Sequence, residues 1–172
     1  MKAEVELTDG DVVLRPFRLE DAETHLSNED IEQVKWVSGG KSTLESVKSW
    51  ILRNQEGWKQ GGPIFNFAIW AKNKLVGMVE ANTNYERFEG LVRGDANISY
   101  GIYSNHRGNG YATKAVNLIT EFLKQKGFSR AILRISPDNI NSLKIPTACG
   151  FGTMGEVVTH EGEMLMFMKD LR

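Results

Sequence analysis

The stretch NHRGNGYATKA, residues 105–115, places a cation and two closely spaced glycines directly before an amphipathic segment. Gly108 and Gly110 carry no Cβ, so a ligand can approach their backbone closely. The first N–H groups of a helix have no intrahelical partner, and the helix dipole favours negative charge there. Arg107 adds a fixed positive charge suited to a phosphate. The stretch therefore predicts an anion site at a helix start, with a tight turn whose glycines only relieve strain as the alternative.

The segments on either side of this stretch predict a strand–turn–helix unit. The sequence ANISYGIY (96–103) has the composition of a strand and leads into the turn. After the turn, apolar residues recur at the i, i+3, i+4, i+7 spacing of an amphipathic helix, and Gly127 is placed to end it. These apolar residues are Ala112, Ala115, Val116, Ile119, Phe122 and Leu123.

The remaining patterns predict a mixed α/β sheet around that unit. Asp21 is expected to cap a short helix, and Ser42 and Glu45 have the spacing of a capping box before a helix containing Leu44, Val47, Ile51 and Trp58. Residues 83–95 are polar and irregular. Strands are expected at 12–18 and 130–136, a helix at 140–149, and hairpins at 63–71 with 75–82 and at 151–159 with 163–169.

Composition sets limits on the class of protein. The chain has 172 residues, 41% of them hydrophobic, so one domain over 1–172 with a substantial core is expected. A net charge of −1 gives no electrostatic reason to expect nucleic-acid or membrane partners. The N-terminus lacks a signal-like apolar core, and the single cysteine, Cys149, can form no internal disulfide, so a cytoplasmic location is expected. The three histidines are scattered, and no metal site is predicted.

Three phosphate-binding patterns can be compared with the sequence. A P-loop requires G-x-x-x-x-G-K-[ST]; GGKST (39–43) ends correctly, but Lys35 stands at the first glycine position, so a helix N-cap is favoured there. The dinucleotide fingerprint G-x-G-x-x-G fails at Thr113. The pattern [QR]-x-x-G-x-[GA] is matched at every position by residues 107–112.

With this last pattern, the sequence resembles the GNAT superfamily of acetyl-CoA-dependent N-acetyltransferases. It looks most like the RimJ/RimL-like branch, the ribosomal-protein N-terminal acetyltransferases. The segments that carry the resemblance are VLRPFRLEDA (13–22), ANISYGIYSNHRGNGYATKA (96–115) and DNINSLKIPTACGF (138–151). The resemblance implies an α/β fold with a mixed, mostly antiparallel sheet of about seven strands and helices on both faces.

The resemblance also implies acetyl-CoA as co-substrate, with no metal. Pantetheine would lie along the central strand at Gly101, Ile102 and Tyr103. The pyrophosphate would bind at a loop consisting of Arg107, Gly108, Asn109, Gly110, Tyr111, Ala112 and Thr113. Asn139 matches an asparagine whose amide contacts the coenzyme in many members, with a helix N-cap as the alternative.

The reaction requires a base, since an ammonium has no lone pair, and it is helped by an acid that protonates the leaving thiolate. Many members carry a tyrosine as acid where this chain has Pro146, and a glutamate as base where it has Asn97. Ser142 matches a serine that the RimJ/RimL-like branch can use as acid; a first-turn helix residue is the alternative. Glu80 could serve as base if it faces the cleft, and a water held by backbone carbonyls is equally open.

The expected partners are acetyl-CoA and an amine acceptor, which is a protein N-terminus or a small molecule, and the expected assembly is a monomer or homodimer. In the family the N-terminal helices cover the acceptor side, so Trp36 and Trp50 are expected near the acceptor. The missing tyrosine and glutamate leave a second function open, a catalytically weak module that binds or senses acyl-CoA.

Overall fold

The protein, described over residues 4–172 by a computed structural model, is built on one eight-stranded sheet with the order β1-β2-β3-β4-β5-β6-β8-β7. Neighbouring strands are antiparallel except β5 and β6, which are parallel. This confirms the mixed, mostly antiparallel sheet. The strands are β1 (Leu7–Asp9), β2 (Val12–Arg15), β3 (Ile64–Ala71), β4 (Lys74–Asn82), β5 (Asp95–Ile102), β6 (Arg130–Ile135), β7 (Gly152–Thr159) and β8 (Gly162–Asp170).

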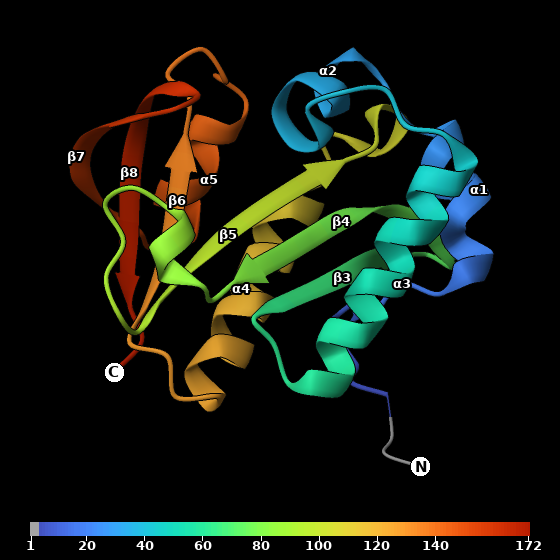
Figure 1. The fold of residues 1–172 in the computed structure, drawn as a ribbon, viewed down its shortest axis with the longest axis horizontal. Coiled ribbons are helices and arrows are strands. Elements are labelled where there is room, and N and C mark those ends of the chain that lie inside the picture. The colour runs from blue at the N-terminus through green and yellow to red at the C-terminus, as the bar shows by residue number, and fades with distance from the viewer. Residues whose placement is uncertain (1–3) are drawn as a thin grey trace.

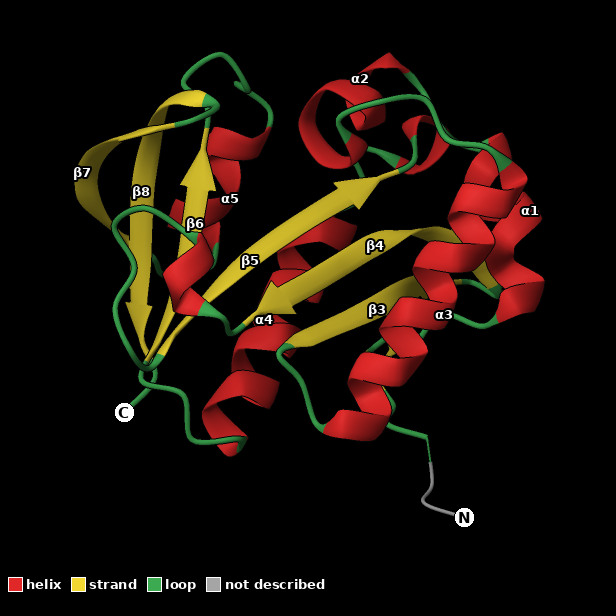
Figure 2. Cartoon of the chain, viewed as in Figure 1, coloured by secondary structure: helices red, strands yellow, loops and turns green. Residues whose placement is uncertain are grey.

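Helices cover both faces of the sheet (Figure 2). The α-helices are α1 (Ala22–Ser27), α2 (Ile31–Gln33), α3 (Leu44–Gln60), α4 (Tyr111–Gln125) and α5 (Ile145–Ala148). A π-helical turn, η2 (Val34–Ser38), continues α2, and 3₁₀ turns lie at η1 (Leu19–Asp21), η3 (Tyr85–Arg87), η4 (Ser104–His106) and η5 (Ser142–Lys144). Helices α1 and α3 lie in front of β3 and β4, and α4 lies behind the sheet (Figure 1).

Each face of the sheet buries its own core. Ile119 of α4 packs with Val79 and Leu133 in the larger cluster, behind the sheet. Ile51 of α3 packs with Met78 in a second cluster, in front of it. The i, i+3, i+4 spacing of apolar residues in α3 and α4 therefore marks the faces that these helices bury against the sheet.

Strands β5 and β6 separate after a short pairing. Only Asp95–Asn97 pairs with Arg130–Ile132, and the two strands then diverge, leaving a wedge between them (Figure 1). The closed end is held by Arg130, whose guanidinium donates two hydrogen bonds of 2.7 Å to Asp95, a side chain only 1% exposed. Beyond Asn97, β5 pairs only with β4.

Two predicted caps are corrected. The capping box of α3 lies one residue later than expected, because Thr43 and Ser46, not Ser42 and Glu45, exchange the hydrogen bonds. Asp21 does not cap α1 through its side chain. Its buried carboxylate instead accepts hydrogen bonds from the guanidinium of Arg15 at 2.9 and 3.0 Å, an interaction that fixes the chain between β2 and α1.

The other element boundaries are close to the prediction. Strand β2 ends at Arg15 rather than residue 18, and Pro16 follows it directly. The turn between β3 and β4 has positive φ at Lys72 and Asn73, as a tight hairpin requires. The helix expected at 140–149 is the short pair η5 and α5, and Pro146 is tolerated because it lies in the first turn. Within residues 4–172, no helix combines the length and apolar character needed to cross a membrane.

Candidate active site

The glycine-rich turn at the start of α4 has the geometry of an anion site. Gly108 and Gly110 adopt φ of 79° and 77°, and a Cβ at either position would meet no atom within 4 Å. The open space lies at the N-terminus of a 15-residue helix. In the described part of the chain, the N–H groups of residues 108–113 donate no hydrogen bond to a protein group. They are therefore available to phosphate oxygens.

Arg107 is less free than the sequence suggested. Its Nε donates to the carbonyl of Ile102 at 2.9 Å, and its guanidinium forms an ion pair of 3.1 Å with Asp30. Asp30 also caps α2 by accepting the N–H of Gln33 at 2.8 Å. Arg107 thus joins the glycine turn to the N-terminal helices, and only part of its charge remains for a phosphate.

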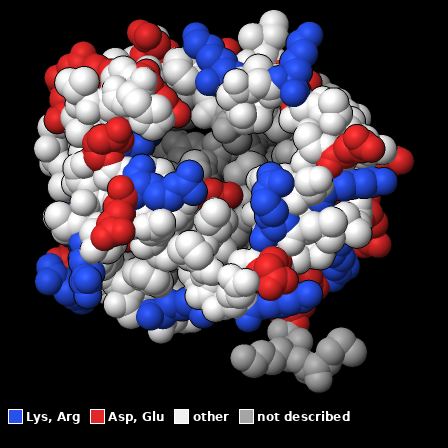
Figure 3. Space-filling view, in the orientation of Figure 1, with Lys and Arg blue, Asp and Glu red and all other residues white. Residues whose placement is uncertain are grey.

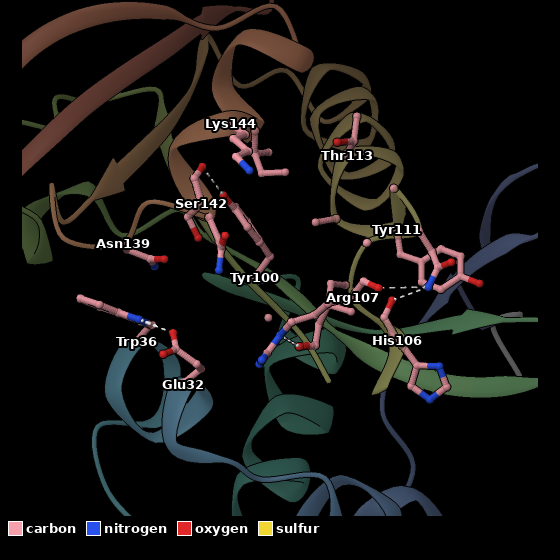
Figure 4. A pocket seen from close by; sticks show the side chains of 18 of the residues that line it. Glu32, Trp36, Tyr100, His106, Arg107, Tyr111, Thr113, Asn139, Ser142 and Lys144 are labelled. Carbon is pink, nitrogen blue, oxygen red and sulfur yellow. Dashed lines mark hydrogen bonds between the residues drawn. The ribbon is translucent and has the colours of Figure 1, made fainter. Parts of the chain in front are cut away.

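A cavity of about 370 Å³, the loop cavity, opens between this turn, the wedge and α2 (Figure 4). Figure 3 shows the hollow above β5, with Lys and Arg side chains on both sides of it. The residues that line the loop cavity include Gly101, Ile102, the whole of 106–113, Asn139, Ser142 and Trp36. Most residues expected to bind the coenzyme therefore lie together here, whereas Tyr103 does not line it.

The backbone of β5 explains the different position of Tyr103. Its N–H donates to the carbonyl of Val76 in β4, and its side chain is 1% exposed in the front core. Because strand hydrogen bonds alternate, the backbone groups of Gly101 also face β4, and those of Tyr100 and Ile102 face the wedge. Of the segment expected to meet pantetheine, Gly101 and Ile102 line the loop cavity together with Tyr100, whereas Tyr103 does not.

Tyr100 is a candidate site residue that the sequence did not predict. Its hydroxyl donates to the backbone carbonyl of Ser142 at 3.2 Å, and both residues line the loop cavity (Figure 4). Burial raises the pKa of Tyr100 to about 12, although the hydrogen bond to Ser142 opposes the shift. The sequence signal was an aromatic residue on the central strand, but its contact lies 42 positions away.

Asn139 and Pro146 differ in their access to the loop cavity. Asn139 is half-buried in the loop cavity, and its side-chain amide forms no hydrogen bond within residues 4–172, so it is not serving as a helix cap. Pro146 is buried in α5 and does not line the loop cavity. The hydroxyls of Ser142 and Tyr100 line the cavity and are candidate proton donors in place of the usual tyrosine.

A second cavity of about 490 Å³, the α3 cavity, lies between α3, the segment 38–42 and the front of the sheet. Glu80 lines it and accepts a hydrogen bond of 2.9 Å from the amide of Asn66, which is fully buried. Burial raises the pKa of Glu80 above its ordinary value, and the bond from Asn66 opposes this. A carboxylate with a raised pKa in a cavity is a suitable proton acceptor.

Aromatic side chains close the side of the α3 cavity nearest α1. Trp50 stacks on His25, with ring centroids 5.0 Å apart, and both line the cavity. The Nδ1 of His25 is hydrogen-bonded to the hydroxyl of Tyr103. Burial lowers the pKa of His25 to about 4, so it is neutral at pH 7. Trp36, expected on the acceptor side with Trp50, instead lines the loop cavity.

The two cavities meet along β5. Gln33 lines both, and Ser99 of the α3 cavity directly precedes Tyr100 of the loop cavity. Glu80 pairs with Ser99 across β4 and β5, so the carboxylate lies beside the junction. The π-helical turn η2, a feature often found at functional sites, follows Gln33 there.

Other reactive groups are not arranged for chemistry. Cys149 is 3% exposed, and burial raises the pKa of its thiol, which fits the expected buried apolar role rather than a nucleophile. His, Cys, Asp and Glu side chains form no cluster of three suited to a metal in the part of the chain that the structure describes.

Comparison with known proteins now identifies the family. Residues 11–152 match the model of the acetyltransferase (GNAT) domain. The chain belongs to the GNAT acetyltransferase family. As a GNAT protein it is an acetyl-CoA-dependent N-acetyltransferase, as the sequence predicted, and its free N–H groups and unpaired β5 edge fit the coenzyme. A search of curated proteins gives no significant match.

Solved structures show the same fold at low sequence identity. A microcin C7 self-immunity acetyltransferase in complex with acetyl-CoA and AMP is 18% identical, with a TM-score of 0.80 over 94% of this chain and 93% of that chain. The ribosomal L7/L12 α-N-protein acetyltransferase RimL gives 13% identity and 0.81 over 96% and 98%. An aminoglycoside acetyltransferase with coenzyme A gives 18% and 0.76 over 92% and 94%. Structures of the predicted RimJ/RimL-like branch are thus among the neighbours.

Proposed function

We propose that this single domain transfers an acetyl group from acetyl-CoA directly to a primary amine while both are bound. The observation that carries the proposal is the meeting of the two cavities at β5. One cavity ends in the free N–H groups of residues 108–113, and the other contains the half-buried carboxylate of Glu80. A cytoplasmic location remains part of the proposal.

In the proposed reaction, Glu80 accepts the proton that the amine loses. Acetyl-CoA supplies the thioester: the new C–N bond forms, the C–S bond breaks, and the thiolate leaves. Burial raises the pKa of Glu80, which makes it a stronger base than an exposed carboxylate. Asn66 holds one carboxylate oxygen, so the other can face the amine. Glu80 would thereby supply the carboxylate base that many members carry at the position where this chain has Asn97.

At the other end of the reaction, the chain offers two hydroxyls for the leaving sulfur. The hydroxyl of Tyr100 is held by the carbonyl of Ser142, and Ser142 contributes a second hydroxyl in the same cavity. With a pKa of about 12, Tyr100 is a hydrogen-bond donor rather than a strong acid at neutral pH. We propose that these hydroxyls donate hydrogen bonds to the thiolate, Tyr100 by turning its O–H from the carbonyl of Ser142 to the sulfur, and that the thiolate then takes its proton from water.

The experiment that tests this function measures thiol release from acetyl-CoA in the presence of a panel of amines, with the acetylated product identified by mass. Turnover with any amine at a rate well above the uncatalysed reaction supports a transferase. Tight binding of acetyl-CoA without turnover would instead support the acyl-CoA-binding module, which Pro146 at the position of the usual tyrosine keeps in consideration.

A further inference from the structure

Two basic side chains line the α3 cavity without an ionic partner. Lys41 precedes α3, and Arg53 lies in its middle; both are exposed and line the cavity. Neither forms an ion pair or a side-chain hydrogen bond with any residue between 4 and 172. Other cations close to functional parts, such as Arg107 and Arg130, are paired.

The charges of the α3 cavity do not balance. Its lining contains one carboxylate, Glu80, against Lys41 and Arg53, while His25 is neutral at pH 7 because burial lowers its pKa to about 4. The nearby carboxylate of Glu29 accepts the N–H of Ser42 at 2.9 Å but does not line the cavity. When the amine of an acceptor lies beside Glu80, the positive charges of Lys41 and Arg53 therefore have no anionic partner in the cavity lining.

The α3 residues that line the cavity form one stripe along the helix. Ser46, Trp50 and Arg53 follow each other at spacings of four and three residues, which place them on the same helix face. The stripe is about 10 Å long, at 1.5 Å per residue. A small acceptor can therefore contact Arg53 and the sheet at once, with the face of Trp50 beside it.

Resting on the proposed function, the geometry points to an acceptor that carries an anionic group, a carboxylate or a phosphate, close to the amine that is acetylated. The anion pairs with Arg53 and Lys41, and the amine faces Glu80. A guanidinium suits either oxyanion, because it can donate two parallel hydrogen bonds. The same cations repel acceptors that carry several ammonium groups, so the cavity selects by repulsion as well as attraction.

Matched acceptors test this inference. Each α-amino acid in a panel is compared with its amide, and phosphoethanolamine with ethanolamine, while spermidine serves as the polycationic acceptor. The wild type should use the anionic member of a pair with a kcat/KM about tenfold to a hundredfold higher, the range of a charged hydrogen bond. The amino-acid and phosphate arms show which oxyanion is preferred.

The variant Arg53→Gln should remove most of that preference by raising KM for the anionic acceptor, with KM for acetyl-CoA unchanged. Lys48→Gln is the matched control, since Lys48 is exposed on the same helix but does not line the cavity. Unfolding midpoints confirm that both variants are folded. Better use of the amides or spermidine, or equal effects of the two variants, would overturn the inference.

Binding separates failure of this inference from failure of the proposed function. Calorimetry with the same acceptor pairs, in the presence of unreactive coenzyme A, measures acceptor recognition without turnover. Selective binding of the anionic member that disappears in Arg53→Gln supports the inference, even if no acceptor is acetylated and the proposed function is refuted. Acetylation with no preference between the members refutes the inference alone.

Discussion

Replacing Glu80 with glutamine should slow acetyl transfer while stabilising the fold. Glutamine keeps the volume of Glu80 and an oxygen for the amide of Asn66, now 2.9 Å from the carboxylate, so only proton acceptance is lost. The usual contribution of a positioned base predicts that kcat falls about 100- to 10,000-fold, or roughly 3–5 kcal/mol in activation free energy. KM for acetyl-CoA should not change, because Glu80 does not line the loop cavity.

The stability effect follows from the direction of the pKa shift. Burial raises the pKa of Glu80 in the folded state above its ordinary value of 4.5, so its favourable contribution is present at low pH and is lost as pH rises through the folded-state pKa. Above that pKa the folded protein contains a costly, half-buried charge, and Glu80→Gln should raise the unfolding midpoint there. The acidic limb of the kcat/KM profile that Glu80 causes should also disappear.

Thiol release at a series of pH values and thermal unfolding at pH 7 measure both effects. Glu6→Gln is the matched control, since Glu6 is exposed and lines neither cavity. Wild-type kcat in Glu80→Gln would assign the base to a water molecule. A lower unfolding midpoint would show that the carboxylate stabilises the sheet and that the reasoning from burial is wrong.

Four further substitutions, one of them with a matched control, test the rest of the site and the fold. Gly110→Val should weaken coenzyme A binding, measured by calorimetry, at least about a hundredfold. The control Gly61→Val has a similar φ of 78° and open surroundings, so it should cause only the backbone strain of about 1–2 kcal/mol. Equal affinities of the two variants for coenzyme A would refute the loop assignment. Tyr100→Phe and Ser142→Ala should each lower kcat about 10- to 100-fold with little change in coenzyme affinity, and wild-type kcat in both would mean that the sulfur leaves without either hydroxyl. Asp95→Asn should lower the unfolding free energy in urea by about 3 kcal/mol, the low end for a broken buried pair because its arginine partner is 20% exposed; a loss below about 1 kcal/mol would contradict a clamp at the closed end of the wedge.

Local sequence patterns predicted most of the fold and the glycine-rich turn that lines the candidate site. The glycine turn could be predicted because the strand, Gly108, Gly110 and the amphipathic helix are contiguous in the sequence. The capping box of α3 was predicted one residue too early, because Ser42 and Glu45 can form the same capping hydrogen bonds as Thr43 and Ser46. The eighth strand was missed because β1 is only three residues long.

Contacts between distant residues limited the prediction of the site. The face of the sheet on which the Glu80 side chain lies follows from the register of β4 with β5, in which Glu80 pairs with Ser99. Alternation of side chains along one strand does not give this register. For the same reason, the sequence could not show that Tyr100 lines the loop cavity while Tyr103 does not. Arg107 looked free because its partner, Asp30, lies 77 positions earlier in the chain.

The unpaired edge of β5 links the lifetime of the protein to metabolism. A coenzyme that occupies the wedge binds the folded chain and not the unfolded one, so it adds about 2.7 kcal/mol of stability at a hundred times its dissociation constant. When opening is fast compared with cleavage, a protease acts on the unfolded fraction, which then falls about a hundredfold. Resistance of this enzyme to proteolysis should therefore rise with the occupancy of its coenzyme site, without any dedicated regulator.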